Sequence, residues 1–139
     1  MQNNNLAIAI IGYGKMGKAI EAIATAKGHR VILKISSANT GDLTIGNLQQ
    51  CDVAIEFTNP HSAVENIKKC MDAGVPVISG STGWLGQLEE IKKYNEEKKA
   101  AFLYASNFSI GVNIFFEVNK KLASLMSDHR EYQVEVEEI

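Results

Sequence analysis

Short apolar runs alternate with segments of helical periodicity along most of the chain. The first run covers residues 6–11, and a helical pattern with Met16, Ala19, Ile20, Ile23 and Lys27 on one face leads to Gly28. Further runs cover residues 31–35, 52–57, 75–79 and 101–105. Strands that alternate with helices predict a parallel sheet with helices on both of its faces.

The connecting segments have the signals of helix ends. Asn59 is placed as an N-cap with Pro60 in the first helical position, and this helix is expected to reach about residue 73, where Gly74 closes it. A charged helix is expected over 85–99, whereas 36–50 is polar and holds only a short segment. We therefore predict an α/β fold with a Rossmann-type parallel sheet, followed by a helix over 110–126 and a strand over 132–139.

Small, polar or aromatic residues follow each predicted strand. These segments are 12–17, 36–37, 57–59, 80–83 and 106–109. In a parallel sheet the carboxyl ends of all strands lie along one rim, where open α/β folds bind their ligands. Any one segment could be turn chemistry alone, but five on one rim indicate a cleft for an extended nucleotide.

The segment after the first strand, Gly12-Tyr13-Gly14-Lys15-Met16-Gly17, matches the dinucleotide-binding pattern in its strand–turn–helix context. Its first glycine permits the tight turn, its second lets a pyrophosphate approach bare backbone, and its third allows close packing of helix and strand. The phosphates would lie on the unpaired amides at the helix start. The alternative is a glycine turn that binds nothing.

The second strand ends without the carboxylate that usually binds the adenosine ribose. Ser36 and Ser37 stand there, and the side chains of Lys34 and Lys15 are expected to lie near them in the fold. These hydroxyls and ammonium groups could accept a 2′-phosphate, or Ser36 could bond a ribose hydroxyl instead. We expect NADPH to be used at least as well as NADH.

Composition narrows the function classes. Of 139 residues, 45% are hydrophobic and 22% charged, with a net charge of −2, which is typical of a globular domain. Neither a nucleic-acid partner nor a membrane association is expected, and no targeting segment is recognised, so we expect a cytoplasmic protein. Cys51 and Cys70 match no metal or redox spacing, so both are interpreted as reduced, partly buried thiols and no metal site is predicted.

Four segments together resemble the bacterial dihydrodipicolinate reductase family over nearly the whole chain: 14–17, 52–58, 77–83 and 105–113. The run Ser106-Asn107-Phe108-Ser109 followed by Gly111-Val112-Asn113 is more specific than the glycine pattern. The resemblance implies a dinucleotide-binding domain over 1–108 and the start of a substrate and oligomerisation domain over 109–139. Many members of the family carry an acidic residue at the position of Ser36. This chain lacks it, so the preference of those members for NADH is not assumed here.

The resemblance also implies a set of cofactor contacts. The glycine turn would hold the pyrophosphate, the segments after the third and fourth strands would line the cofactor towards the nicotinamide, and 105–108 would close over the nicotinamide. The expected cofactor-binding residues are Gly12, Tyr13, Gly14, Lys15, Met16, Gly17, Ser36, Phe57, Thr58, Gly80, Ser81, Thr82, Ala105, Ser106, Asn107 and Phe108.

The implied activity is the NAD(P)H-dependent reduction of dihydrodipicolinate to tetrahydrodipicolinate in the diaminopimelate route to lysine. The substrate is a small dicarboxylate, and the complete enzyme would be a homotetramer. In the family the last strand continues into a histidine pair, a lysine and an Asp-x-Pro-Ser-Gly-Thr segment, which serve the substrate. The sequence stops at Ile139 before any of these, so we expect a fragment that is inactive alone.

No catalytic residue is predicted within the chain. His29 and His129 lie in connecting segments and His61 in the first turn of a helix, and we expect none to have a carboxylate partner. Two alternatives stay open: another Rossmann reductase, and a stand-alone module that senses NAD(P) without turnover.

The helix over 110–126 carries a broad apolar stripe, namely Gly111, Ile114, Phe115, Phe116, Val118, Leu122, Leu125 and Met126. In the family this helix begins the oligomerisation domain. We expect the isolated chain to self-associate or to become partly disordered beyond about Asn107.

Overall fold

A computed structural model describes residues 5–133, 135 and 137. The chain divides into two compact units, Met1–Ser106 and Asn107–Ile139, each of which is described by itself. The expected boundary between residues 108 and 109 lies two residues further along.

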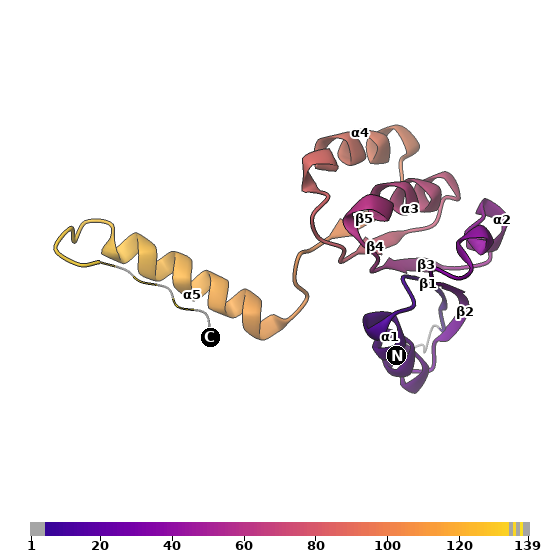
Figure 1. Cartoon of the computed structure of the whole chain (residues 1–139), viewed down its shortest axis with the longest axis horizontal. Helices are drawn as coiled ribbons and strands as arrows, with labels where there is room; N and C mark the ends of the chain where they lie inside the picture. The colour runs from indigo at the N-terminus through magenta and orange to yellow at the C-terminus, as the bar shows by residue number, and fades with distance from the viewer. Residues whose placement is uncertain (1–4, 134, 136, 138–139) are drawn as a thin grey trace. The chain divides into compact units, whose positions relative to one another are not determined.

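The first unit is built on a parallel sheet (Figure 1). Its strands are β1 (Ala7–Ile11), β2 (Arg30–Ile35), β3 (Val53–Glu56), β4 (Val77–Ser79) and β5 (Phe102–Tyr104). Their order is β2-β1-β3-β4-β5, and every neighbouring pair is parallel. This arrangement confirms the predicted Rossmann-type sheet and brings the five post-strand segments to one rim.

The connecting helices are α1 (Lys15–Ala26), α2 (Ile45–Leu48), α3 (Pro60–Asp72) and α4 (Leu88–Lys98). Short 3₁₀ turns at Thr40–Asp42 and Leu85–Gln87 precede α2 and α4. The Asn59 side chain caps α3 by accepting from the amides of His61 and Ser62, as the sequence predicts. The four helices follow the predicted segments closely.

Alternate residues of β1 face opposite sides of the sheet and belong to two hydrophobic clusters. Ala9 and Ile11 belong to a large cluster with buried residues of α2, α3 and α4. Ile8 and Ile10 belong to a small cluster whose third buried member is Ala24 of α1. The larger part of the core therefore lies on the α3 and α4 face.

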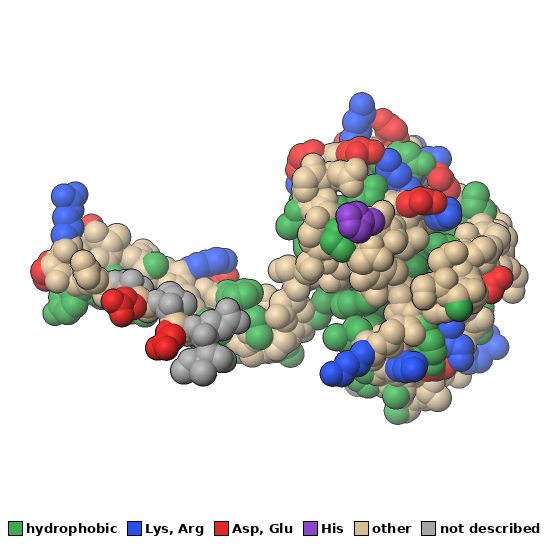
Figure 2. All heavy atoms as spheres, viewed as in Figure 1, with side chains coloured by type: hydrophobic (Ala, Val, Ile, Leu, Met, Phe, Trp, Pro, Cys, Tyr) green, Lys and Arg blue, Asp and Glu red, His purple; other side chains and the backbone are tan. Residues whose placement is uncertain are grey.

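Helix α1 buries a different stripe from the one that the apolar residues suggest. Gly17 and Ala24 are its buried positions, whereas Met16 and Ile23 are exposed. The close approach at Gly17 turns this side of the helix to the sheet, and larger side chains would not fit there. Figure 2 shows positive and negative side chains on the visible face of the first unit.

The second unit contains α5 (Ile110–Met126), which begins at the Ser109 cap, where the hydroxyl accepts from the Val112 amide. None of its residues is buried within the chain. The predicted strand over 132–139 is not formed at the described residues 132, 133, 135 and 137, and its other residues lie outside the described part of the chain. A strand needs a hydrogen-bonding partner, and the described residues offer none to this segment.

Candidate functional site

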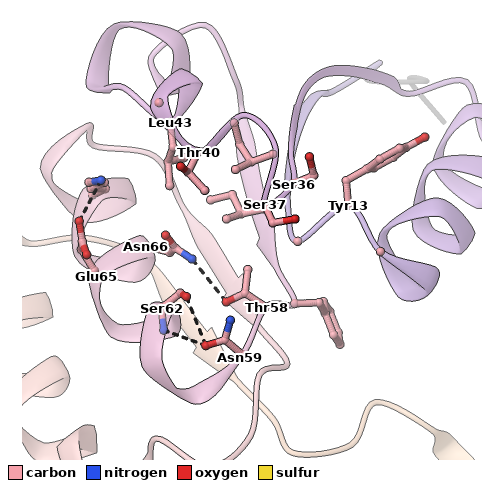
Figure 3. A pocket seen from close by; sticks show the side chains of 17 residues that line it. Tyr13, Ser36, Ser37, Thr40, Leu43, Thr58, Asn59, Ser62, Glu65 and Asn66 are labelled. Atoms are coloured by element: carbon pink, nitrogen blue, oxygen red, sulfur yellow. Dashed lines mark hydrogen bonds and ion pairs between the residues drawn. The ribbon is translucent and has the colours of Figure 1, made fainter.

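A cavity of about 630 Å³ opens at the carboxyl ends of β1, β2 and β3 (Figure 3). Its walls come from the glycine turn, the segment after β2, the segment after β3 and one side of α3. The lining residues are Ile11, Gly12, Tyr13, Gly14, Ile35, Ser36, Ser37, Thr40, Gly41, Leu43, Phe57, Thr58, Asn59, Ser62, Glu65, Asn66 and Lys69. The cavity is therefore at the rim where the parallel sheet is expected to bind a ligand.

The glycine turn owes its shape to close backbone packing. Gly12 has φ 100°, and a Cβ there would overlap the carbonyl oxygen of Phe57. A Cβ on Gly17 would lie 2.5 Å from the Gly12 carbonyl oxygen, so the start of α1 packs directly on the turn. A Cβ on Gly14 meets no atom within 4 Å, which leaves the backbone open at this point.

The start of α1 has the geometry that suits an anion. Gly14 is its N-cap, and no side chain accepts a hydrogen bond from the helix there. The first amides of an α-helix lack intrahelical partners and carry the positive end of the helix dipole. An open backbone beside such amides suits a pyrophosphate.

Three side chains form a cluster between α1 and β2. Tyr13 donates a hydrogen bond to Glu21 Oε2, and Lys34 Nζ lies 3.2 Å from Glu21 Oε1 and 5.3 Å from the centre of the Tyr13 ring. The hydrogen bond to Glu21 raises the pKa of Tyr13 and that of Lys34, and the bond from Tyr13 lowers the pKa of Glu21. The Lys34 ammonium is thus already paired with a carboxylate.

The segment after β2 presents hydroxyl groups to the cavity. Asn39 Oδ1 accepts from the amide and the hydroxyl of Ser36, at 2.8 and 3.0 Å. Asn39 Nδ2 in turn donates to the Lys34 carbonyl oxygen at 2.9 Å. Ser36 is held in place by this loop, and Ser37 beside it also lines the cavity. No carboxylate follows β2 directly, as the sequence indicates.

The opposite wall is polar and belongs to β3 and α3. Asn66 Nδ2 donates to Thr58 Oγ1 at 3.4 Å, and the Ser62 hydroxyl donates to Asn59 Oδ1 at 3.3 Å (Figure 3). On the next turn of α3, Lys69 Nζ lies 3.0 Å from Glu65 Oε1. The cavity is therefore bordered by amides, hydroxyls and one ion pair.

Behind Thr58 lies Glu56, a fully buried carboxylate that our reading of the sequence does not single out. Its Oε1 accepts from the Thr58 amide at 3.0 Å, from the Thr58 hydroxyl and from the Ser81 hydroxyl at 2.8 Å. Its Oε2 accepts from the Ser79 hydroxyl at 2.6 Å. The sequence does hold a signal for this buried carboxylate. A glutamate stands within an apolar strand, and hydroxyl residues follow two neighbouring strands.

The structure brings together part of the predicted site. Gly12, Tyr13, Gly14, Ser36, Phe57 and Thr58 line the cavity. Lys15, Met16 and Gly17 form the first turn of α1, and Gly80, Ser81 and Thr82 follow β4. Ala105 and Ser106 follow β5 in the first unit, whereas Asn107 and Phe108 belong to the second.

The segment after β4 supports the cavity from behind. A Cβ on Gly80 would overlap the Phe57 ring, so the ring lies directly against this glycine. Ser81 is buried, and its hydroxyl accepts from the Thr58 amide at 2.7 Å. Lining residues that the sequence did not indicate, such as Leu43 and Asn66, come from the segment before α2 and from the middle of α3.

Histidines add no catalytic cluster to this rim. His61 is exposed on the first turn of α3. The expectation that no histidine has a carboxylate partner was wrong for His129, whose Nδ1 lies 3.4 Å from Glu131 Oε1 in the second unit. Among the described residues no group of histidine, cysteine and acidic side chains has the arrangement of a metal site. Both cysteines, Cys51 and Cys70, are buried and free, as the sequence indicated.

Solved structures share this fold. One is a crystal structure of a protein from Klebsiella pneumoniae, with a TM-score of 0.55 and 20% sequence identity; the match covers 73% of this chain and 34% of that one. Within the described residues, no helix has the length and apolar character to cross a membrane.

Sequence comparison is more specific. The 4-hydroxy-tetrahydrodipicolinate reductase of Christiangramia forsetii is 43% identical over 133 residues, which are 95% of this chain and 54% of that protein. The reductase of the same name from Methanocaldococcus jannaschii is 33% identical over 131 residues, or 94% of this chain and 41% of that protein. The chain thus spans about half the length of these relatives. The family model for the N-terminus of dihydrodipicolinate reductase matches residues 6–108, and the chain therefore belongs to the dihydrodipicolinate reductase family.

Proposed function

We propose that this chain supplies the NAD(P)H-binding part of a 4-hydroxy-tetrahydrodipicolinate reductase. The observation that carries the proposal is the glycine turn, in which Gly12 packs on the Phe57 backbone and Gly14 leaves the start of α1 open to the cavity. Family membership supports the same reading. The complete protein would reduce its dicarboxylate substrate in diaminopimelate and lysine biosynthesis.

The residues of the cavity suit the parts of a dinucleotide. The α1 amides and the bare backbone at Gly14 would bind the pyrophosphate, and Ser36 and Ser37 would contact the adenosine ribose. Phe57 and Thr58, with 80–82 behind them, would form the wall towards the nicotinamide. When bound, the reduced nicotinamide supplies a hydride, while these residues bind and orient it.

We further propose that NADPH is used at least as well as NADH. The absence of a carboxylate directly after β2 removes the usual barrier to a 2′-phosphate. Because Lys34 is paired with Glu21, the hydroxyls of Ser36 and Ser37 are the groups that would receive this phosphate. A preference for NADH of tenfold or more, equal to about 1.4 kcal/mol, would contradict the proposal.

Substrate binding and proton donation are assigned to parts of the protein beyond the described rim. The cavity residues include no histidine, and its lysine, Lys69, is paired with Glu65. A dianionic substrate needs cationic or donor groups beside the nicotinamide. We propose a cytoplasmic homo-oligomer, in which such groups complete the site.

The test is a titration of this chain with NADH and NADPH, followed by nicotinamide fluorescence and thermal unfolding. Saturable binding should raise the stability by RT ln(1 + [L]/Kd), or about 2.7 kcal/mol at a hundredfold excess over Kd. Failure of both cofactors to bind would reject the proposed site. Binding without substrate reduction by the full-length protein would favour a sensor of NAD(P) over a reductase.

A further inference from the structure

The carboxylate of Glu56 is completely buried and is surrounded by donors from two strand ends. The donors are the amide and hydroxyl of Thr58 and the hydroxyls of Ser79 and Ser81. Among the described residues, no lysine, arginine or histidine forms an ion pair with it. Its oxygen atoms are satisfied by hydrogen bonds alone, which must be made for the burial of such a polar group to be tolerated.

These hydrogen bonds fix where three hydroxyl hydrogens point. The hydroxyls of Thr58 and Ser81 donate to Glu56 Oε1, and the hydroxyl of Ser79 donates to Glu56 Oε2. The other contacts agree with this assignment. Ser81 Oγ accepts from the Thr58 amide at 2.7 Å, and Thr58 Oγ1 accepts from Asn66 Nδ2 at 3.4 Å.

Thr58 also lines the cavity, where its oxygen can therefore offer only a lone pair (Figure 3). A group that bonds to this oxygen has to be a donor. The pyrophosphate of a dinucleotide has no hydrogen to give, so it does not suit this oxygen. The amides at the start of α1 are donors, so they prefer acceptor groups such as phosphate oxygens.

We propose that Glu56 is a positioning residue, which holds the Thr58 hydroxyl as an acceptor for a donor group on the bound dinucleotide. The donor is a ribose hydroxyl or the amide N–H of the nicotinamide. This inference rests on the proposed function and deepens it, because it assigns hydrogen-bond donors to one part of the cleft and an acceptor to another. The phosphates belong at the glycine turn and the donor-bearing end belongs at Thr58.

The test is a double-mutant cycle with Glu56→Leu, which removes the acceptor of the Thr58 hydroxyl, Thr58→Val and the double variant, in which the Kd for NADH is measured. Each single change should weaken binding by about tenfold, the loss expected for one hydrogen bond. The double variant should bind as Thr58→Val does, because Glu56 acts through Thr58. Losses that multiply, or an unchanged Kd for Glu56→Leu, would overturn the inference.

Ser79→Ala is the matched control. It removes one donor from the same carboxylate, but Ser79 is buried and is not among the cavity residues. It should lower the midpoint of thermal unfolding and leave the Kd within about twofold of the original value. A loss of affinity as large as that of Glu56→Leu would show a general structural effect and would overturn the positioning role.

Thr58→Ser and Thr58→Val keep the inference testable if Glu56→Leu does not fold. The serine variant retains the acceptor and should bind NADH at least fivefold more tightly than the valine variant, an effect within the range of one hydrogen bond. Equal weakening by the two changes would overturn the inference.

Two further probes identify the donor and separate this inference from the proposed function. An equal Thr58→Val loss for ADP-ribose and NADH supports a ribose hydroxyl. A loss that disappears with the 3-acetylpyridine analogue, which lacks the amide N–H, supports the nicotinamide amide. If the original chain binds none of NADH, NADPH and ADP-ribose, the proposed function fails and the inference with it. Tight cofactor binding whose Kd does not change when Glu56 is substituted overturns the inference alone.

Discussion

The three glycines of the turn after β1 limit substitution for different reasons. Gly12 has a positive φ and lies against the Phe57 carbonyl, and Gly17 packs on Gly12. Gly14 has no neighbouring atom within 4 Å of an added Cβ, and its φ is −92°. The fold therefore needs glycine at Gly12 and Gly17. At Gly14 the fold tolerates a side chain, and only a bound ligand would require glycine there.

Gly14→Ala and Gly12→Ala form a pair that tests this distinction. Gly14→Ala should change the free energy of unfolding by less than about 1 kcal/mol and weaken dinucleotide binding by about tenfold or more, because the methyl group covers the α1 amides. Gly12→Ala should destabilise the fold by about 3 kcal/mol or more. Chemical denaturation and cofactor titration measure both effects; unaltered binding by Gly14→Ala would place the pyrophosphate elsewhere.

Cys70 is expected to be an unreactive thiol. Burial, followed by the charges of Glu56 and Cys51, raises its pKa from 9.0 to about 12. Between these values the folded protein retains a proton that the unfolded chain loses, so this group makes the fold less stable as the pH rises from about 9 to 12. At pH 8 a thiol reagent should modify Cys70 only at the rate of unfolding. Cys70→Ala identifies its signal, and rapid labelling in the folded protein would contradict the burial.

Residues that act with near neighbours were predictable from the sequence, and residues that act across the sheet were not. The glycine turn and the Asn59 cap are local patterns, and both are found. Glu56 obtains its partners from the segment after β4, which is beside it only because β3 and β4 are neighbours in the sheet. Its role therefore depends on strand order as well as sequence.

At the scale of elements, α3 and α4 lie side by side over one face of the sheet (Figure 1). Polar contacts join their outer surfaces. Asp72 Oδ1 accepts from the Tyr94 hydroxyl at 2.7 Å and lies 2.6 Å from Lys98 Nζ. Lys68 Nζ lies 2.5 Å from Glu90 Oε1 and 5.2 Å from the centre of the Tyr94 ring. These contacts orient α4 on the sheet.

Asp72→Asn should show how much this connection contributes. The hydrogen bonds from Lys98 and then Tyr94 lower the pKa of Asp72 from 3.8, so its stabilising effect is present above about pH 4 and is lost as the pH falls through the lowered value. At pH 7 the variant should be less stable by about 1 kcal/mol or less. Below the lowered pKa of Asp72 the two proteins should unfold alike. Glu89→Gln, which removes an exposed pair with Lys92 within α4, is the control, and an equal loss there would contradict a special role for Asp72.

The periodicity of apolar residues predicted where the helices and strands lie better than it predicted which side of each element is buried. The strands and α5 lie where the apolar runs indicate. In α1 the stripe suggested by Met16 and Ile23 is exposed, because the buried side is selected by close backbone contact at Gly17. The strand expected over 132–139 needs a partner strand, which its alternating residues cannot supply by themselves.

At the scale of the whole chain, the hydrophobic core belongs to one unit. Every buried residue among those described lies between Ala7 and Ile91, whereas α5 exposes Ile110, Phe115 and Val118 among its apolar side chains. The stability of the sheet should therefore be independent of the second unit. The expectation of self-association or partial disorder beyond about Asn107 stays a prediction.

A chain that ends at Ser106 should test this independence. Its thermal midpoint should lie within about 3 °C of that of the full sequence, since both hydrophobic clusters are made of residues of the first unit. Calorimetry of both chains, each at several concentrations, separates folding from association. A midpoint lowered by about 10 °C would show that the second unit stabilises the sheet directly.

The unequal cover on the two faces of β1 has a consequence for the order in which the protein opens. The small cluster of Ile8, Ile10 and Ala24 fastens α1 to the sheet, and β2 beside it is an edge strand. Amide hydrogens of this half should exchange with solvent through local opening before those under α3. The same half carries the glycine turn and Ser36, so a dinucleotide bound there would bridge the weaker half to the stronger one. The contacts that bind the cofactor would then also hold the two halves of the domain together.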